Sequence, residues 1–143
     1  MNAGKEVSLH LSSMKFLSRQ MENILLIKNC IYIFFLFKRK SINSCISEIK
    51  KQKKQTSSFR ISPISTSKKI KRIYDFFGVS TCLLNSICLS YILKRNGFSP
   101  KIKIGVRLDS KKSLKSHSWV LVDNQEIYKT PNSEDFKEIV VFF

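Results

Sequence analysis

The chain has 143 residues, 43% of them hydrophobic, which is a globular composition and a length for one domain with or without an extension. Its formal net charge of +16 is uneven, because residues 1–72 hold 16 Lys/Arg against 3 Asp/Glu while residues 73–143 hold 10 against 7. The four cysteines lack C-x-x-C spacing and no cleavable signal peptide is recognisable, which argues against zinc and against secretion. We therefore expect reduced thiols, no metal, no cofactor and a cytoplasmic protein.

The first segments are polar and then strongly apolar. Residues 1–22 are mixed and predict no element, whereas residues 24–37 are apolar apart from Lys28 and Asn29, and a basic cluster at 38–40 follows. A helix of this apolar segment measures about 21 Å, which is short of the roughly 30 Å hydrocarbon core of a bilayer. Two interpretations stay open: a helix at a membrane surface, and a helix packed on the rest of the protein.

A second basic segment, residues 41–54, is weakly amphipathic and predicts a helix with one packed side. The apolar side of that helix consists of Ile42, Cys45, Ile46 and Ile49. A Ser/Thr-rich stretch follows, and residues 68–77 predict a short helix. We therefore divide the chain into a basic, apolar helical extension (1–56), a linker (57–67) and a folded domain (68–143).

The clearest helix signals begin at residue 80. Thr81 is a favourable N-cap residue and Gly97 a favourable C-cap, and between them apolar side chains recur at helical spacing. These side chains are Leu84, Ile87, Cys88, Tyr91 and Ile92. Cys82 lies in the first turn, where unpaired backbone N–H groups and the helix dipole favour a thiolate. Cys88 lies in the apolar stripe and is predicted to be a buried thiol.

After the helix the hydrophobic period changes to that of strands. Residues 101–108 alternate between apolar and polar, and a second strand begins at His117, with Trp119 on the same face as His117. A turn and a returning strand follow, beginning at Ile127. The apolar end, residues 139–143, is predicted to be a last strand that is buried, since an exposed apolar terminus invites aggregation.

Cys82 and His117 together suggest nucleophilic catalysis. A cysteine at a helix start and a histidine on a following strand can form a thiolate–imidazolium pair that attacks a carbonyl group and forms an acyl thioester. Trp119 is expected to wall the site and to contact substrate. The alternative interpretation is that Cys82 is a structural thiol and His117 a surface residue of the strand.

The same region resembles the transglutaminase-like cysteine peptidases that process lasso-peptide precursors. These leader peptidases are related to the C-terminal domain of the microcin-processing protein. The motifs that carry the resemblance are Cys82-Leu83, Arg95-Asn96-Gly97, Ile104-Gly105-Val106 and His117-Ser118-Trp119-Val120. The match covers roughly residues 70–125. One departure is Lys129, which stands where the family usually has an acidic residue.

The resemblance implies an α+β fold in which N-terminal helices precede a transglutaminase-like, papain-like core. In that core the cysteine at a helix N-terminus packs on a small antiparallel sheet that carries the histidine. The implied activity is cleavage of the leader from a ribosomally made lasso-type precursor peptide, in the cytoplasm. The implied partners are the precursor, a separate leader-recognition protein and a lasso cyclase, and the basic extension adds peripheral membrane contact as a candidate. Because the family also begins with apolar helices, we favour a packed helix over residues 24–37.

Two other function classes remain. An acyl transferase of the same fold uses the same two residues, so the sequence does not separate it from a peptidase. A basic nucleic-acid-binding module fits the charge, but the basic half is rich in Ile and Phe and contains no recognisable binding motif. We therefore expect no nucleic acid among the partners.

The group that orients the imidazole depends on how the chain turns after residue 122. A turn at residues 124–125 places Asn132 opposite His117, and a turn at residues 123–124 places Thr130 there. We assign Asn132 as the third catalytic residue. Asp135 is the reserve, and a bare Cys–His dyad is the remaining alternative.

Overall fold

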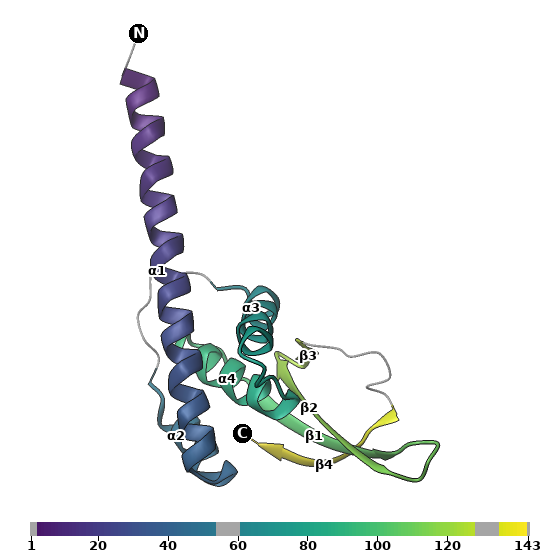
Figure 1. The fold of residues 1–143 in the computed structure, drawn as a ribbon. Coiled ribbons are helices and arrows are strands. Elements are labelled where there is room, and N and C mark those ends of the chain that lie inside the picture. The colour runs from purple at the N-terminus through teal and green to yellow at the C-terminus, as the bar shows by residue number, and fades with distance from the viewer. Residues whose placement is uncertain (1–2, 54–60, 128–134, 143) are drawn as a thin grey trace.

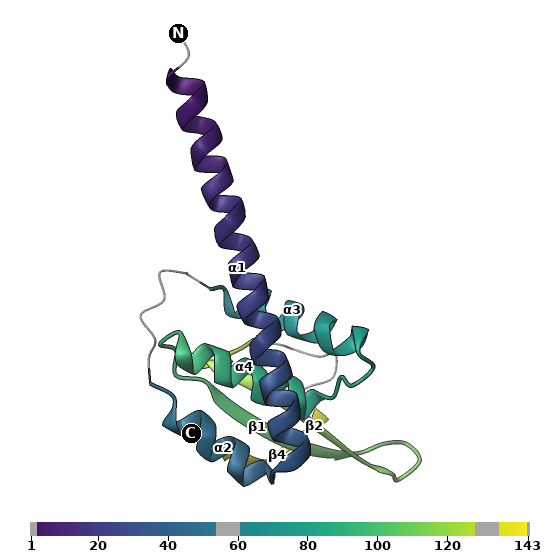
Figure 2. The same ribbon diagram turned by 60° about the vertical axis from the view of Figure 1, so that its left-hand side comes forward.

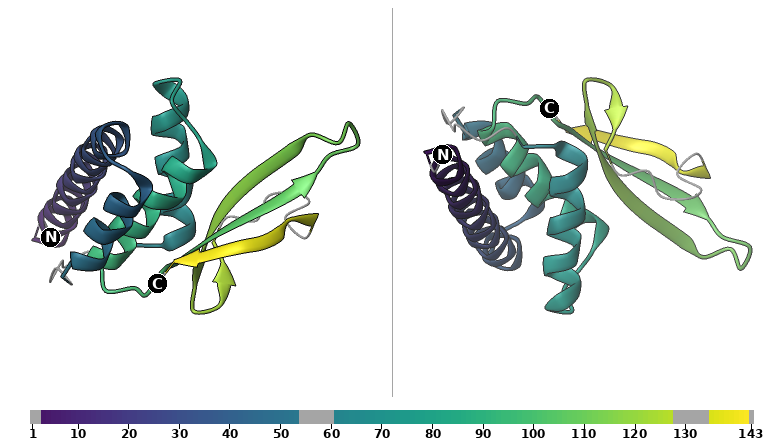
Figure 3. Two further views of the ribbon diagram at one scale, coloured as in Figure 1. Left: turned by 90° about the horizontal axis from the view of Figure 1, so that it is seen from below. Right: turned by 90° about the horizontal axis from the view of Figure 1, so that it is seen from above.

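The computed structural model describes residues 3–53, 61–127 and 135–142, which form helices followed by an antiparallel sheet (Figure 1). The helices are α1 (Ala3–Arg39), α2 (Ile42–Lys51), α3 (Pro63–Phe76) and α4 (Cys82–Arg95). The strands are β1 (Lys101–Leu108), β2 (Leu114–Val122), β3 (Gln125–Glu126) and β4 (Lys137–Phe142). The predicted α+β class with an antiparallel sheet is confirmed. The helices form one layer and the sheet a second layer, as Figure 3 shows.

Helix α4 is the centre of this arrangement. It lies between the sheet on one side and the other three helices on the opposite side, and Figure 2 shows α1 crossing its outer surface. Every residue of α4 from Ser86 to Leu93 is therefore buried. The five apolar residues predicted to form its stripe are all buried, and Cys88 is one of them. A helix that is buried on all sides needs apolar residues beyond a single stripe, and Leu89 and Leu93 supply them.

The sheet has the strand order β3-β2-β1-β4, with β1 paired antiparallel to β2 and to β4. Strand β1 has the bounds predicted from its alternating sequence. Between β2 and β3 the turn residues are Asp123 and Asn124, both with positive φ (51° and 63°), so that Val122 pairs with Gln125. Asn and Asp tolerate this left-handed conformation, which is typical of a two-residue hairpin turn.

The N-terminal helix is longer than predicted. Helix α1 begins at Ala3, so the expectation of no element over residues 1–22 is wrong. The stretch from Leu11 to Met21 contains no Gly or Pro and consists largely of residues with good helix propensity, so the helix continues through it. The 29 residues from Leu11 to Arg39 are long and apolar enough to cross a membrane by length and composition. Length therefore does not exclude a membrane-spanning helix, contrary to the estimate from residues 24–37.

Both N-terminal helices contribute to the core around α4. Cys30 and Ile33 of α1 and Cys45, Ile46 and Ile49 of α2 belong to the same buried cluster as the apolar side chains of α4. The Tyr74 hydroxyl donates a hydrogen bond to the backbone oxygen of Cys30 at 2.9 Å, which joins α3 to α1. The packed-helix interpretation of residues 24–37 therefore holds for one face of α1.

The third helix begins earlier than predicted. Pro63 is its first residue and Ser62 its N-cap, so residues 63–67 form the start of this helix. The reason is that proline is favourable in the first turn of a helix, where its missing N–H and fixed φ cost nothing. Residues 57–60 of the predicted linker lie outside the described residues. The division of the chain at residues 56 and 67 stays a prediction.

The last strand forms as predicted, but it is not buried. Strand β4 lies at the edge of the sheet, where Ile139 is 55% exposed and Val141 44% exposed. Helix α4 packs on β2 and β1, so most of β4 lies beyond the surface that the helix covers, while Phe142 at its end packs against the core cluster. Phe143 lies outside the described residues.

Candidate active site

Cys82 is the first residue of α4, at the point where the helix is capped. The hydroxyl oxygen of Thr81 accepts a hydrogen bond from the backbone N–H of Leu84 at 3.2 Å. This cap satisfies one of the unpaired N–H groups of the first turn and holds the helix start in one conformation. Of the four cysteines, Cys82 is partly exposed and the other three are buried. Cys82 is thus the thiol that a substrate can reach.

His117 lies on β2, directly opposite Gly105 of β1. Its imidazole ring stacks on the indole of Trp119, with 5.9 Å between the ring centroids and 17° between the planes. The ring of Phe136 lies on it as well, at 5.4 Å. Trp119 is only 5% exposed. The prediction that Trp119 shares the face of His117 is therefore confirmed, and two aromatic rings shield the imidazole.

One small cavity brings the thiol and the imidazole residue together. It has a volume of about 30 Å³ and lies between the first turns of α4, strand β2 and helix α3. Its lining consists of Ser67, Lys71, Cys82, Asn85, Ser86, Leu89, His117, Ser118, Trp119 and Val120. Tertiary packing has therefore placed Cys82, His117 and Trp119, which the sequence predicted as site residues, around one space.

The electrostatic surroundings favour a neutral imidazole. Burial lowers the pKa of His117 below its usual value of 6.5, and the positive charge of Arg107 lowers that pKa further. The Arg107 guanidinium lies 4.7 Å above the ring of Phe136, and its Nη1 is 3.2 Å from a carboxylate oxygen of Asp135. Because the neutral form of imidazole accepts a proton, these surroundings suit a general base near neutral pH.

Gly105 leaves the space that Trp119 occupies. A Cβ atom at this position would lie 2.9 Å from a carbon of the Trp119 ring and 3.0 Å from the Cβ of Phe136. The pairing of β1 with β4 also shifts its register between Ile104 and Gly105. A larger residue at position 105 would therefore push the indole, and with it the stacked imidazole, out of place.

The turn after β2 bears on which residue lies opposite His117. Because the turn consists of residues 123 and 124, the register that placed Asn132 opposite His117 is wrong at its start. The backbone N–H of Ile127 donates to the oxygen of Val120 at 2.9 Å, and this register continued along β2 reaches Thr130. Asn132 and Thr130 both lie outside the described residues, so the identity of the third group stays a prediction.

Of the cavity residues that were not predicted from the sequence, two lie close to Cys82 on α4. Asn85 and Ser86 follow Cys82 by three and four positions, which places them on the same face of the helix. This spacing was the available signal. Asn85 Oδ1 and Trp119 Nε1 are buried without a hydrogen-bond partner among the described residues. Polar atoms left in this state are uncommon in proteins, and here both belong to residues that line the cavity.

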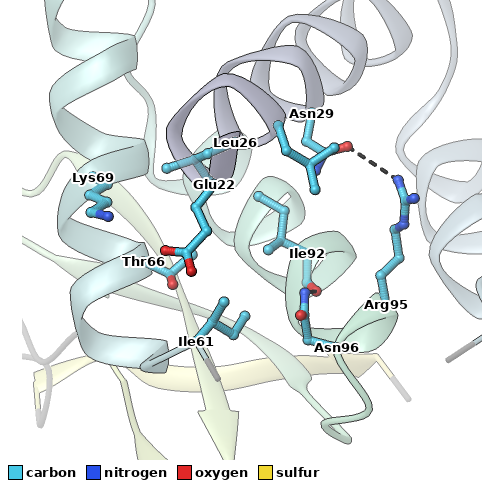
Figure 4. Close-up of a pocket in the computed structure, with 10 residues that line it drawn as sticks. Glu22, Leu26, Asn29, Ile61, Thr66, Lys69, Ile92, Arg95 and Asn96 are labelled. Atoms are coloured by element: carbon cyan, nitrogen blue, oxygen red, sulfur yellow. Dashed lines mark hydrogen bonds between the residues drawn. The ribbon is translucent and has the colours of Figure 1, made fainter. Parts of the chain in front are cut away.

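A larger cavity, of about 80 Å³, lies between α1, α3 and α4 (Figure 4). Glu22, Lys69 and Arg95 are the charged residues of its lining. Arg95 donates to Asn29 Oδ1 at 3.2 Å, shown by the dashed line in Figure 4. No cysteine, histidine or serine lines this space among the described residues, so it lacks the nucleophile and base found around Cys82. This cavity lies where α1 packs against α3 and α4.

A protein metal site needs several His, Cys, Asp or Glu side chains close together. Within residues 3–53, 61–127 and 135–142, no three His, Cys, Asp or Glu side chains gather closely enough to hold a metal ion.

A cysteine at a helix start that lines the same cavity as a histidine on an antiparallel strand is the arrangement that the resemblance implied. A family model described as the transglutaminase-like superfamily matches residues 50–141, which is more than half of the chain. The chain belongs to the transglutaminase-like superfamily. This superfamily includes cysteine peptidases and acyltransferases, and membership indicates an enzyme related to cysteine proteases. No curated protein and no solved structure matches this transglutaminase-like chain.

Proposed function

We propose that this protein is a cysteine peptidase that removes the leader from a ribosomally made lasso-type precursor peptide. The observation that carries the proposal is the shared cavity, which Cys82 lines from the first residue of α4 and His117 lines from β2. The lasso-type substrate is supported by the four sequence motifs of residues 82–120, which occur in order with the spacing of the leader peptidases. Superfamily membership supports the thiol chemistry.

Each step of the reaction uses a group near this cavity. The neutral imidazole of His117 takes the proton of the Cys82 thiol, and the thiolate attacks the carbonyl carbon of the scissile peptide bond. The negative charge of the tetrahedral intermediate is stabilised by the backbone N–H of Cys82, which is unpaired in the first helical turn. When the C–N bond breaks, the leaving amine takes the proton from His117. Water, deprotonated by His117, then hydrolyses the thioester and frees the thiol.

The aromatic residues around His117 have a defined part in this scheme. Trp119 and Phe136 pack on the imidazole and hold its ring, while Gly105 makes room for the indole. A base that is held by packing loses little conformational freedom during the reaction. Trp119 also lines the cavity, and we assign it to contact the substrate next to the scissile bond.

The size of the cavity bears on how a precursor is recognised. A space of about 30 Å³ is far smaller than the roughly 300–1,000 Å³ of ligand pockets, so it does not enclose a peptide segment. Recognition of the leader must then use surfaces outside the cavity. This fits a pathway in which a separate leader-recognition protein presents the precursor in the cytoplasm, and a lasso cyclase takes the product.

The test combines the purified protein with a precursor peptide and a recognition protein encoded beside it. We expect mass spectrometry to show the leader and the core peptide, with the mass of one water molecule added in total, and no reaction with Cys82→Ala. A leader joined to an added amine would instead identify an acyl transferase. Neighbouring genes without any precursor, recognition protein or cyclase would contradict the lasso-type substrate.

A further inference from the structure

The side of α1 that points away from the domain is apolar and uncovered. Its exposed side chains recur at intervals of three, four and seven residues and are Met14, Leu17, Met21, Ile24, Ile31 and Phe35. Residues at this spacing lie along one side of a helix. In the most apolar 18-residue window of α1 only 11% of the residues are buried. An uncovered apolar surface of this extent indicates an interaction site.

The contacts on the opposite side of α1 argue against a helix that crosses a bilayer. Asn23 Oδ1 accepts a hydrogen bond from Lys69 of α3, and Asn29 Oδ1 accepts one from Arg95 of α4, each at 3.2 Å. Cys30 is fully buried in the core of the domain. A segment held in this way along a charged domain does not enter the hydrocarbon region. The helix therefore meets its partner with its outer side only.

The uncovered surface continues from α1 onto the end of α3. An apolar groove of about 390 Å³ lies between the two helices and is lined by Ile31, Phe34, Phe35, Ile73, Tyr74, Phe77 and Val79. Phe76 is 84% exposed beside this groove, and its ring packs edge-on against Phe77 at 5.3 Å. We call the combined surface the α1 apolar face: Leu17, Met21, Ile24, Ile31, Phe35, Phe76 and Phe77.

The charged residues around the α1 apolar face indicate what kind of partner binds there. Lys38 lies 5.8 Å from the ring of the half-buried Phe34 and Arg39 lies 5.7 Å from the ring of the exposed Phe35, so both cations lie next to the aromatic residues of this surface. Lys28 lies between Ile24 and Ile31 along the same helix. With a net charge of +16 on each chain, a second copy would be repelled. The surface therefore fits an occupant that is apolar and negatively charged.

We propose that the α1 apolar face docks on the surface of an anionic bilayer, with α1 lying along the interface. The apolar side chains enter the boundary between headgroups and acyl chains, and the neighbouring Lys and Arg side chains contact the lipid phosphates. The inference rests on α1 and the end of α3 and is independent of the peptidase site.

The test is flotation of the full chain with lipid vesicles. We expect the protein to float with vesicles of phosphatidylcholine and phosphatidylglycerol, to stay behind with phosphatidylcholine alone, and to be released by high salt. The variant Ile24→Ser/Phe35→Ser/Phe76→Ser should bind at least about tenfold more weakly, since it removes three apolar side chains from the interface. Lys28→Gln/Arg39→Gln should weaken binding to the anionic vesicles as well.

A matched control comes from the β1–β2 hairpin. Leu108 and Leu114 are 68% and 69% exposed there, so Leu108→Ser/Leu114→Ser removes exposed apolar side chains at another place and should bind like the unaltered chain. Cys82→Ala should also bind normally. Equal flotation of the triple variant and the control, with both folded by circular dichroism, would overturn the proposal. So would a dimer in light scattering that the triple variant converts to a monomer without any vesicle binding.

Discussion

The hydroxyl oxygens of Ser86 and Ser118 lie 3.1 Å apart in the core and join α4 directly to β2. Ser86 follows Cys82 by one helical turn, and Ser118 follows His117 by one residue. Successive side chains of a strand alternate between its faces, so Ser118 points to α4 while His117 and Trp119 lie beside Phe136. This buried contact therefore fixes the spacing between the elements that carry the proposed nucleophile and base.

Alkylation should separate the four cysteines. We expect iodoacetamide at neutral pH to label Cys82 first, because Cys30, Cys45 and Cys88 are fully buried. Burial also raises the pKa of Cys88, which makes that thiol still less reactive. Cys82→Ala should abolish processing, whereas Cys88→Ala should retain it and lower the free energy of unfolding by about 1 kcal/mol. Processing by Cys82→Ala at the normal rate would remove Cys82 from the mechanism.

Loss of the α4 cap should affect catalysis as well as stability. Thr81→Ala removes the acceptor for the Leu84 N–H and should cost about 1 kcal/mol in unfolding free energy. The first turn then frays at Cys82, so the processing rate should fall too. Ser62→Ala removes the corresponding cap of α3 and serves as the control. It should lower stability to a similar degree with little change in rate, and equal rate losses in the two variants would contradict a positioning role for Thr81.

Enlarging Gly105 should displace the indole next to the base. Gly105→Ala places a Cβ within 2.9 Å of the Trp119 ring and should lower the unfolding free energy by about 1–3 kcal/mol, with a lower processing rate. The measurement is urea unfolding with parallel rates. Trp119→Phe removes the ring carbons that clash, so the double variant should regain part of the stability lost. Full additivity of the two changes would show that the residues do not interact.

The pH dependence should report on Arg107. Because its charge helps to keep the pKa of His117 below 6.5, Arg107→Gln should raise that pKa. The base is active in its neutral form, so the acid limb of the rate profile should move to higher pH. Lys103→Gln is the control, since Lys103 lies on the same strand and pairs with Glu138. Equal shifts of the acid limb in both variants would point to a general charge effect.

The orienting partner of His117 can be found by comparing two alanine variants. An extension of the register observed as far as Ile127 would put Thr130 opposite His117, so Thr130→Ala is expected to slow processing roughly tenfold or more and Asn132→Ala to slow it less. Circular dichroism checks that both variants fold. A large loss with Asn132→Ala and none with Thr130→Ala would support the assignment of Asn132 as the third residue. Full processing rates in both variants would leave two possibilities, a Cys–His dyad without a third group or Asp135 as the third catalytic residue.

Local chemistry explains which elements were predictable. The helix that starts at Cys82 has a cap at each end, and β1 alternates over its whole length, so both are visible in a short window of sequence. The start of α3 was missed because proline is typical both of linkers and of the first turn of a helix. Pro63 was assigned to the linker, but it is the first residue of α3. The start of α1 was missed because residues 11–21 are mixed in composition, although Met14, Leu17 and Met21 recur at helical spacing.

The sequence by itself determined the chemistry available to this protein: a cysteine at a capped helix start, a histidine and tryptophan two positions apart on a strand, and a basic N-terminal half. Tertiary structure alone decided that Cys82 and His117 line one cavity, that Asn85 and Ser86 join them, and that β4 lies at the exposed edge. Helix caps and hydrophobic periodicity depend on residues close together in the chain, so they can be recognised from a short stretch of sequence. The cavity and the edge depend on how α4 crosses the sheet, which results from the packing of side chains far apart in the sequence.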